Sequence, residues 1–271
     1  MCDVCVMNAV KDRMLSRRDL FRGGVALAAG GTALATGTAA LADGHGSVRD
    51  LTHAYDETFP TFFNEPGIAY DQVFNFAEHG FNLFDLTIRE HTGTHIDAPL
   101  HFSADGRSVD EIEVGNLVVP LCIVDIREKA DADPDAQVTP EDLAAWIEAN
   151  GDIPDRACVA MNSGWTSKVE TEAYRGADAD GGLHFPGFHP EATAMLLETT
   201  SASAMAVDTL SLDHGPSGDF ATHYAWLPAG RYGIENLALT DDIPAAGATL
   251  VVGAPTHKRG TGGPARIFAM V

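Results

Sequence analysis

The sequence predicts an α/β fold with a mixed β-sheet. Short apolar runs bounded by turn residues indicate buried strands, and two segments between them begin with helix-capping residues. Strands that alternate with helices are typical of α/β domains. A further apolar run at the very C-terminus, RIFAMV, adds another strand and favours a mixed sheet. The apolar runs cover residues 117–126, 157–161, 203–210, 248–255 and 266–271.

The other elements follow from local signals. Apolar and polar side chains alternate over residues 81–90, which is the period of a half-buried strand. A first helix is expected to begin after Thr139, an N-cap residue followed by proline, and to end at Gly151. A second helix is expected at residues 189–200, which begin in a similar way.

Residues 1–42 have the pattern of a twin-arginine export signal. Adjacent Arg17 and Arg18 precede a mildly apolar, glycine-rich run, and the small-residue triplet at 40–42 offers a cleavage site. We therefore expect one mature domain, residues 43–271, in the periplasm, delivered already folded by the twin-arginine export machinery. The alternative, an uncleaved membrane anchor, is disfavoured because the run holds many glycines and few bulky apolar residues.

The charge balance excludes two classes of partner. The chain carries 17 Lys and Arg residues against 39 Asp and Glu residues, which gives a formal net charge of -22. Such a charge repels nucleic acids and anionic membranes instead of attracting them. We therefore expect no nucleic acid and no membrane as a partner.

The segment EHTGTHIDAPLHF, residues 90–102, concentrates three histidines and an aspartate. A glycine, a proline and two β-branched threonines disfavour a helix there. An extended or turning backbone lets the odd-numbered residues His91, His95 and Asp97 project to a common side. Two imidazoles and a carboxylate form a ligand set for zinc, manganese or iron(II), with positions left open for water and substrate. The segment therefore predicts a metal site.

His101 is a further histidine of the same segment. Three roles are open to it: a fourth metal ligand, a structural residue, or a proton shuttle beside the metal. Chemistry favours the shuttle, because hydrolysis of an amide requires a proton to leave the attacking water and another to reach the departing nitrogen. A neutral imidazole can carry both protons near neutral pH. We therefore predict that His101 is the catalytic acid and base.

The motif HTGTHIDAPLHF resembles the H-x-G-T-H-x-D-x-P-x-H signature of the cyclase family of metal hydrolases, which includes enzymes of the kynurenine formamidase and isatin hydrolase types. A second block, THYAWLPAGRYGIENL, and the C-terminal segment GATLVVGAPTHKRGTGGPARIFAMV are similar to that family as well. The likeness covers nearly all of the mature chain. It implies a swivelling β/β/α fold and a homo-oligomer, either a dimer or a tetramer.

The resemblance also implies roles for single residues. It assigns the first metal ion to the two histidines and the aspartate of the metal motif, and the acid/base role to His101. His223 and Glu235, in the second block, match the rest of the cluster, although two residues so far apart form no local motif. In formamidase-like members this pair completes a site for two zinc ions, whereas isatin-hydrolase-like members hold a single manganese. The resemblance thus implies Mn²⁺ or Zn²⁺, as one ion or two.

The expected reaction is metal-dependent hydrolysis of a C–N bond in a small cyclic amide, as in isatin hydrolase. The first alternative is an aryl formamide, as in kynurenine formamidase. We expect Trp165, Phe62 and Phe63 to form a flat aromatic wall for the substrate, with core packing as the alternative role for each. A serine hydrolase is disfavoured because the sequence has no G-x-S-x-G elbow. A periplasmic metal-binding protein without catalysis is the other alternative, and it would not need His101.

Overall fold

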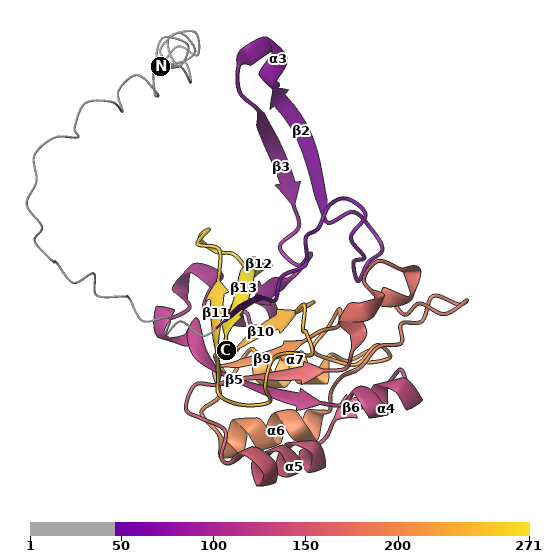
Figure 1. Ribbon diagram of the computed structural model, residues 1–271, viewed down its shortest axis with the longest axis vertical. Helices are drawn as coiled ribbons and strands as arrows, with labels where there is room; N and C mark the ends of the chain where they lie inside the picture. The colour runs from indigo at the N-terminus through magenta and orange to yellow at the C-terminus, as the bar shows by residue number, and fades with distance from the viewer. Residues whose placement is uncertain (1–46) are drawn as a thin grey trace, which may run out of the picture. The chain divides into compact units, whose positions relative to one another are not determined.

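The computed structural model describes residues 47–271. The centre of the fold is a nine-stranded mixed sheet (Figure 1). The predicted export signal lies outside the described residues. The four central strands pair in parallel and the flanking strands pair antiparallel, which confirms the predicted α/β fold with a mixed sheet. In sheet order the strands are β1 (Val48–Asp50), β13 (Arg266–Met270), β11 (Ala248–Gly253), β5 (Val118–Asp125), β7 (Cys158–Asn162), β9 (Ala204–Val207), β10 (Tyr232–Glu235), β4 (His95–Asp97) and β12 (Gly262–Pro264).

The two helices expected from capping signals are present. Helix α5 starts after Thr139, whose side chain forms a capping box with Asp142, and it ends at Gly151. Helix α6 starts after His189, whose side chain accepts a hydrogen bond from the Glu191 amide. In residues 47–271 no helix is long and apolar enough to cross a membrane. The helices are α3 (Phe76–His79), α4 (Arg127–Ala132), α5 (Pro140–Asn150), α6 (Pro190–Thr199) and α7 (Ala221–Trp226).

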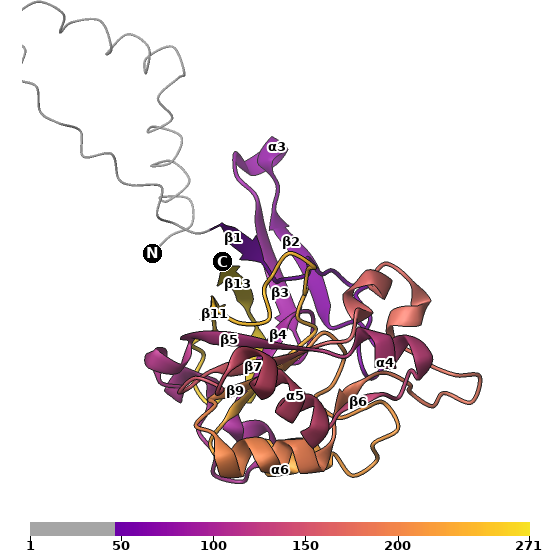
Figure 2. The same cartoon turned by 60° about the horizontal axis from the view of Figure 1, so that its bottom comes forward.

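Apolar side chains pack against both faces of the sheet. In β5, Leu121 and Ile123 belong to one apolar cluster, whereas Cys122 and Val124 belong to another. Helices α5 and α6 lie together and pack on the second cluster (Figure 2). Strands that are buried on both faces carry continuous apolar runs, which explains why the sequence located these strands.

The sequence leaves open whether Cys122 and Cys158 form a disulfide. They lie on the neighbouring strands β5 and β7, but Cys122 packs on one face of the sheet and Cys158 on the other. Both thiols are therefore free and buried. Burial raises the pKa of Cys122 to about 12, so its thiol stays protonated and unreactive near neutral pH.

Residues 70–86 form a compact unit of their own. Strands β2 (Ile68–Phe74) and β3 (Leu83–Ile88) make a two-stranded sheet, and α3 lies between them in the chain (Figure 1). A strand was expected at residues 81–90, but the prediction that it is half-buried is wrong, because all six residues of β3 are exposed. A further two-stranded sheet pairs β6 (Gln137–Val138) with β8 (Gly187–Phe188) in parallel.

Candidate metal centre

Strand β4 carries two of the predicted ligands, His95 and Asp97. All three of its residues are buried, and it lies between β10 and β12 in the sheet. The antiparallel register with β10 places Glu235 directly opposite His95. Residues two apart on a strand, and residues directly opposite each other on paired strands, point to the same face of a sheet. The pairing of two distant segments therefore brings His95, Asp97 and Glu235 to one face.

All five predicted ligands converge at this point. The Nδ1 atom of His91 lies 2.6 Å from Asp97 Oδ1. The Nε2 atom of His95 lies 3.4 Å from Asp97 Oδ1 and 3.3 Å from Glu235 Oε2. Helix α7 contributes His223, whose Nε2 atom lies 3.1 Å from Glu235 Oε1 and 3.5 Å from Asp97 Oδ2. Every member except His91 is buried.

Hydrogen bonds on the outer side of the two buried histidines orient their rings. His95 Nδ1 lies 2.9 Å from the carbonyl oxygen of Gly93, and His223 Nδ1 lies 2.6 Å from Asp213 Oδ2. Both partners are acceptors, so each ring donates from Nδ1 and directs Nε2 towards the carboxylates. Histidines that ligate metals are usually held in this way.

His91 is held by a chain of two residues. Thr261 Oγ1 lies 2.9 Å from His91 Nε2, and the Thr261 hydroxyl donates to the Glu90 carboxylate. The same carboxylate accepts from the Thr261 backbone amide. Sequence spacing does not identify Thr261 or Asp213 as outer partners, because the fold alone brings them to histidines 170 and 10 residues away.

The cluster fits a divalent cation. The buried atoms His95 Nε2 and Asp97 Oδ2 have no hydrogen-bond partner, which is unusual for polar atoms inside a protein. His95, Asp97 and Glu235 each offer a ligand atom within 4.8 Å of the others. Imidazole nitrogens and carboxylate oxygens together suit zinc, manganese and iron. A cation among them would satisfy the two orphaned atoms.

The pKa values of the cluster also favour a bound cation. Burial acts to raise the pKa of Asp97, but the charge of His91 and hydrogen bonds from His223 hold it well below the usual range. Burial also opposes protonation of His95, yet Asp97 and Glu235 raise its pKa to about 10. The buried carboxylates are therefore ionised and draw positive charge into the site. A divalent cation would supply that charge in place of protons on the histidines.

His101 lies beside the cluster, in a 3-10 turn (Pro99–Phe102) that follows β4. Its ring stacks on the ring of His91, with centroids 3.8 Å apart. His91, Asp97 and His101 form a second group of donors within 4.8 Å of one another. Burial lowers the pKa of His101 to about 4, so the imidazole is neutral near neutral pH.

A cavity of about 280 Å³ opens onto the cluster, and four phenylalanines line it together with apolar and polar residues; we call it the aromatic cavity. Phe62 and Phe63 line it, at positions where the sequence suggested an aromatic wall. Phe102 and Phe220 also line it, and the Phe102 ring lies 4.6 Å from the ring of His223. The sequence did not single out these two phenylalanines. The only feature of the sequence that could have pointed to them is that each lies within three residues of a predicted site histidine.

Trp165 does not line this cavity. Its side chain is buried in an aromatic cluster with Phe59, Tyr174 and Phe185. Its indole Nε1 donates to the carbonyl oxygen of Tyr174 at 2.7 Å. The structure thus gives Trp165 the core-packing role that the sequence left as the alternative.

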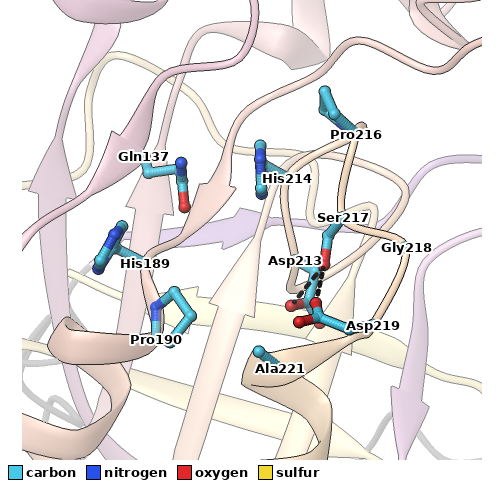
Figure 3. A pocket seen from close by; sticks show the side chains of 10 residues that line it. All are labelled: Gln137, His189, Pro190, Asp213, His214, Pro216, Ser217, Gly218, Asp219 and Ala221. Atoms are coloured by element: carbon cyan, nitrogen blue, oxygen red, sulfur yellow. Dashed lines mark hydrogen bonds between the residues drawn. The ribbon is translucent and has the colours of Figure 1, made fainter.

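A separate pocket of about 580 Å³ lies next to Asp213 (Figure 3). His189, His214 and Ser217 line it together with Asp213, and the Ser217 hydroxyl donates to Asp213 Oδ1 at 3.3 Å. None of the five predicted ligands lines this pocket. Asp213 therefore contacts His223 as well as this pocket, but the donor cluster belongs to the smaller aromatic cavity.

Comparisons with known proteins show the family of this chain. Residues 49–214 match a family model described as putative cyclase. The chain is 30% identical to isatin hydrolase of Roseibium aggregatum over 220 aligned residues. These residues cover 77% of this chain and 82% of that protein. The chain is also 29% identical to kynurenine formamidase of Salinibacter ruber over 170 aligned residues, which cover 63% of this chain and 71% of that protein. The solved structure of isatin hydrolase A from Labrenzia aggregata, bound to benzyl benzoate, matches with a TM-score of 0.79 and 34% identity, covering 85% of this chain and 96% of that chain.

Fold, donor cluster and relatives together define a metal-dependent hydrolase that acts on non-peptide C–N bonds. The chain belongs to the cyclase family. The resemblance carried by the motif HTGTHIDAPLHF is thereby confirmed. The mixed sheet with its helices is likewise the fold of the solved members of the family.

Proposed function

We propose that this chain hydrolyses the C–N bond of a small cyclic aryl amide of the isatin type. The observation that carries the proposal is the aromatic cavity with the donor cluster in its wall. Its volume of about 280 Å³ is close to the lower end of the range for small-molecule sites, roughly 300–1,000 Å³. Such a cavity suits a planar bicyclic molecule. The similarity to isatin hydrolase over most of both chains supports this substrate class.

We propose Mn²⁺ or Zn²⁺ as the cation, held by His91, His95 and Asp97, with His223 and Glu235 completing the site. One or two ions are compatible with these donors, because Asp97 presents Oδ1 to His91 and His95 and Oδ2 to His223. The chemistry that such a cation supplies when bound is Lewis-acid activation of water and of the amide carbonyl.

The residues of the chain provide the proton transfers and the orientation of the substrate. His101, neutral and stacked on His91, takes a proton from the attacking water and passes it to the departing nitrogen. The phenylalanine walls, Phe62 and Phe102 among them, hold a planar aromatic ring against the cluster. Cleavage of the amide in a ring then yields an amine and a carboxylate on one product.

The test offers isatin, N-formylkynurenine and a set of simple lactams to the mature protein loaded with Mn²⁺ or Zn²⁺, while absorbance reports cleavage. We expect the highest kcat/KM for isatin. A higher value for N-formylkynurenine would favour an aryl formamide as the substrate. Absence of cleavage by the fully loaded protein would instead favour a metal-binding protein without catalysis.

We propose that the protein is exported to the periplasm by the twin-arginine pathway. The motivation is the adjacent pair Arg17 and Arg18 before a glycine-rich apolar run. Replacing both with lysine should retain the protein in the cytoplasm, as measured by cell fractionation. Arg13→Lys combined with Arg22→Lys is the matched control, because it changes two nearby arginines outside the pair. Periplasmic recovery of the Arg17→Lys/Arg18→Lys variant would refute the export route.

We propose that the protein is a homo-oligomer, a dimer or a tetramer. The support is the exposed apolar surface of the two-stranded unit, because a hairpin is marginally stable alone and an exposed apolar edge favours association. Sedimentation equilibrium should give a multiple of the protomer mass, and Phe84→Asp with Leu86→Asp should lower it. A protomer mass for the parent would contradict the proposal. The exposed apolar residues of β2, α3 and β3 are Tyr70, Val73, Phe76, Leu83, Phe84, Leu86 and Ile88.

A further inference from the structure

Asn236 follows Glu235 directly at the end of strand β10 and is only 2% exposed. Its backbone φ of 55° lies in the left-handed region, which residues other than glycine seldom adopt. Asparagine tolerates this region better than most residues, but backbones held there concentrate at functional sites. Asn236 also lines the aromatic cavity.

The side-chain amide of Asn236 shares an acceptor with His95. Asn236 Nδ2 donates to the carbonyl oxygen of Gly93 at 2.9 Å, and His95 Nδ1 lies 2.9 Å from the same oxygen. A carbonyl oxygen only accepts, so His95 carries a proton on Nδ1 and turns Nε2 towards the carboxylates. A carbonyl that Asn236 holds in place therefore fixes the orientation of the His95 ring.

Tyr174 fixes the other end of the same amide. Its hydroxyl, on a fully buried side chain, lies 3.0 Å from Asn236 Oδ1 and 3.2 Å from the carbonyl oxygen of Asp208, and its proton is shared between these two acceptors. The contact with Oδ1 leaves Nδ2 for Gly93. The backbone carbonyl of Asn236 accepts from Thr94 Oγ1 at 2.6 Å. Asn236 thus ties the end of β10 to the segment just before β4 by two independent hydrogen bonds.

We propose that Asn236 is a positioning residue of the metal centre, which acts on His95 through the carbonyl of Gly93 and is itself oriented by Tyr174. The inference rests on the proposed metal-dependent hydrolysis, but it concerns how firmly the cation is held before any substrate binds. Losing an outer partner of a ligating histidine usually lowers metal affinity by roughly 10–100-fold. The same order is expected for loss of the Asn236 amide.

The test compares Asn236→Gly and Tyr174→Phe with the parent protein. Glycine adopts the left-handed backbone without strain and removes the amide, whereas phenylalanine keeps the buried ring and removes only the hydroxyl. Competition with a chromophoric chelator measures the affinity for Zn²⁺ and Mn²⁺, and the visible absorption of the Co²⁺-loaded protein reports the ligand geometry. For Asn236→Gly we expect an affinity lower by about 10–100-fold and an altered Co²⁺ spectrum. Tyr174→Phe should show a smaller fall in the same direction.

Asn64→Gly is the matched control. Asn64 has nearly the same backbone conformation, with a φ of 56°, but it is exposed and does not line the aromatic cavity. Its variant should keep the parental metal affinity. Thermal unfolding of each variant detects a general loss of structure, which a merely structural role would produce without a change in affinity.

The outcomes separate this inference from the proposed function. Parental affinity and an unchanged Co²⁺ spectrum in Asn236→Gly would overturn the inference, whatever the unfolding temperature. If that variant does not fold, Tyr174→Phe decides alone, and parental affinity there overturns it. If the parent hydrolyses no isatin but the affinity still falls in the variants, the positioning role stands and only the substrate assignment fails.

Discussion

Asp97→Ala should leave the mature protein nearly free of metal and without measurable hydrolysis. Asp97 belongs to both donor groups, and its oxygens lie between 2.6 and 3.5 Å from nitrogen atoms of three histidines. A carboxylate can neutralise the charge of a cation and bridge two ions, whereas an imidazole cannot. We therefore expect a larger loss of metal for Asp97→Ala than for alanine at His91 or His95, as measured by elemental analysis.

Asp208→Asn is the control for this prediction. Asp208 is also a fully buried acid, but it accepts hydrogen bonds from Ser163 and Trp165 and belongs to neither donor group. Burial raises its pKa to about 6. The Asp208→Asn variant should therefore keep its metal, even where its unfolding temperature changes. Full metal occupancy in Asp97→Ala would show that the donor set is misassigned.

His101→Ala should keep its metal and lose turnover by a factor on the order of a hundred or more, the usual scale for loss of a general acid or base. The physical reason is that His101 is neutral and stacked on His91, where it can accept and return a proton. His101→Asn should behave in the same way, because an amide can keep a hydrogen bond but cannot carry a proton. Elemental analysis and kcat, measured on the same preparations, test both halves of the prediction.

His184→Asn is the matched control for His101→Asn. His184 pairs with Asp135 and Asp178, and it belongs to neither donor group and does not line the aromatic cavity. Loss of metal together with activity in His101→Ala would make His101 a ligand, and retained activity would make it structural. In either case the base would lie elsewhere, and Glu235 would be the next candidate.

The buried strands of the sheet are the part of the fold that the sequence predicts well. Strands such as β5 and β7 are covered on both faces, so their apolar runs are unbroken and easy to recognise. Strand β4 is not visible in the sequence, because it has three residues, two of them polar, and exists through its pairing with β10 and β12. The alternation near β3 predicts a strand correctly, but the buried face inferred from it does not exist within the described chain.

For the site, too, the sequence predicts the residues that lie close together in the chain and not those that the fold brings together. The metal motif lies within one short segment, so spacing alone predicts His91, His95 and Asp97 as neighbours. Glu235 reaches them through strand register, which no local pattern encodes, and only the family resemblance pointed to it. Outer partners such as Thr261 are ordinary polar residues whose role depends entirely on the fold.

The central claim is that this chain hydrolyses a small cyclic aryl amide with a cation held by the buried donor cluster. The most direct test titrates the metal-free mature protein with Mn²⁺, and separately with Zn²⁺, while the ring opening of isatin is followed by absorbance and bound metal is measured on the same samples. We expect no hydrolysis without metal and a rate that rises in proportion to occupancy until the site is saturated. Equal hydrolysis by the metal-free protein, or full occupancy with no hydrolysis of isatin, would contradict it.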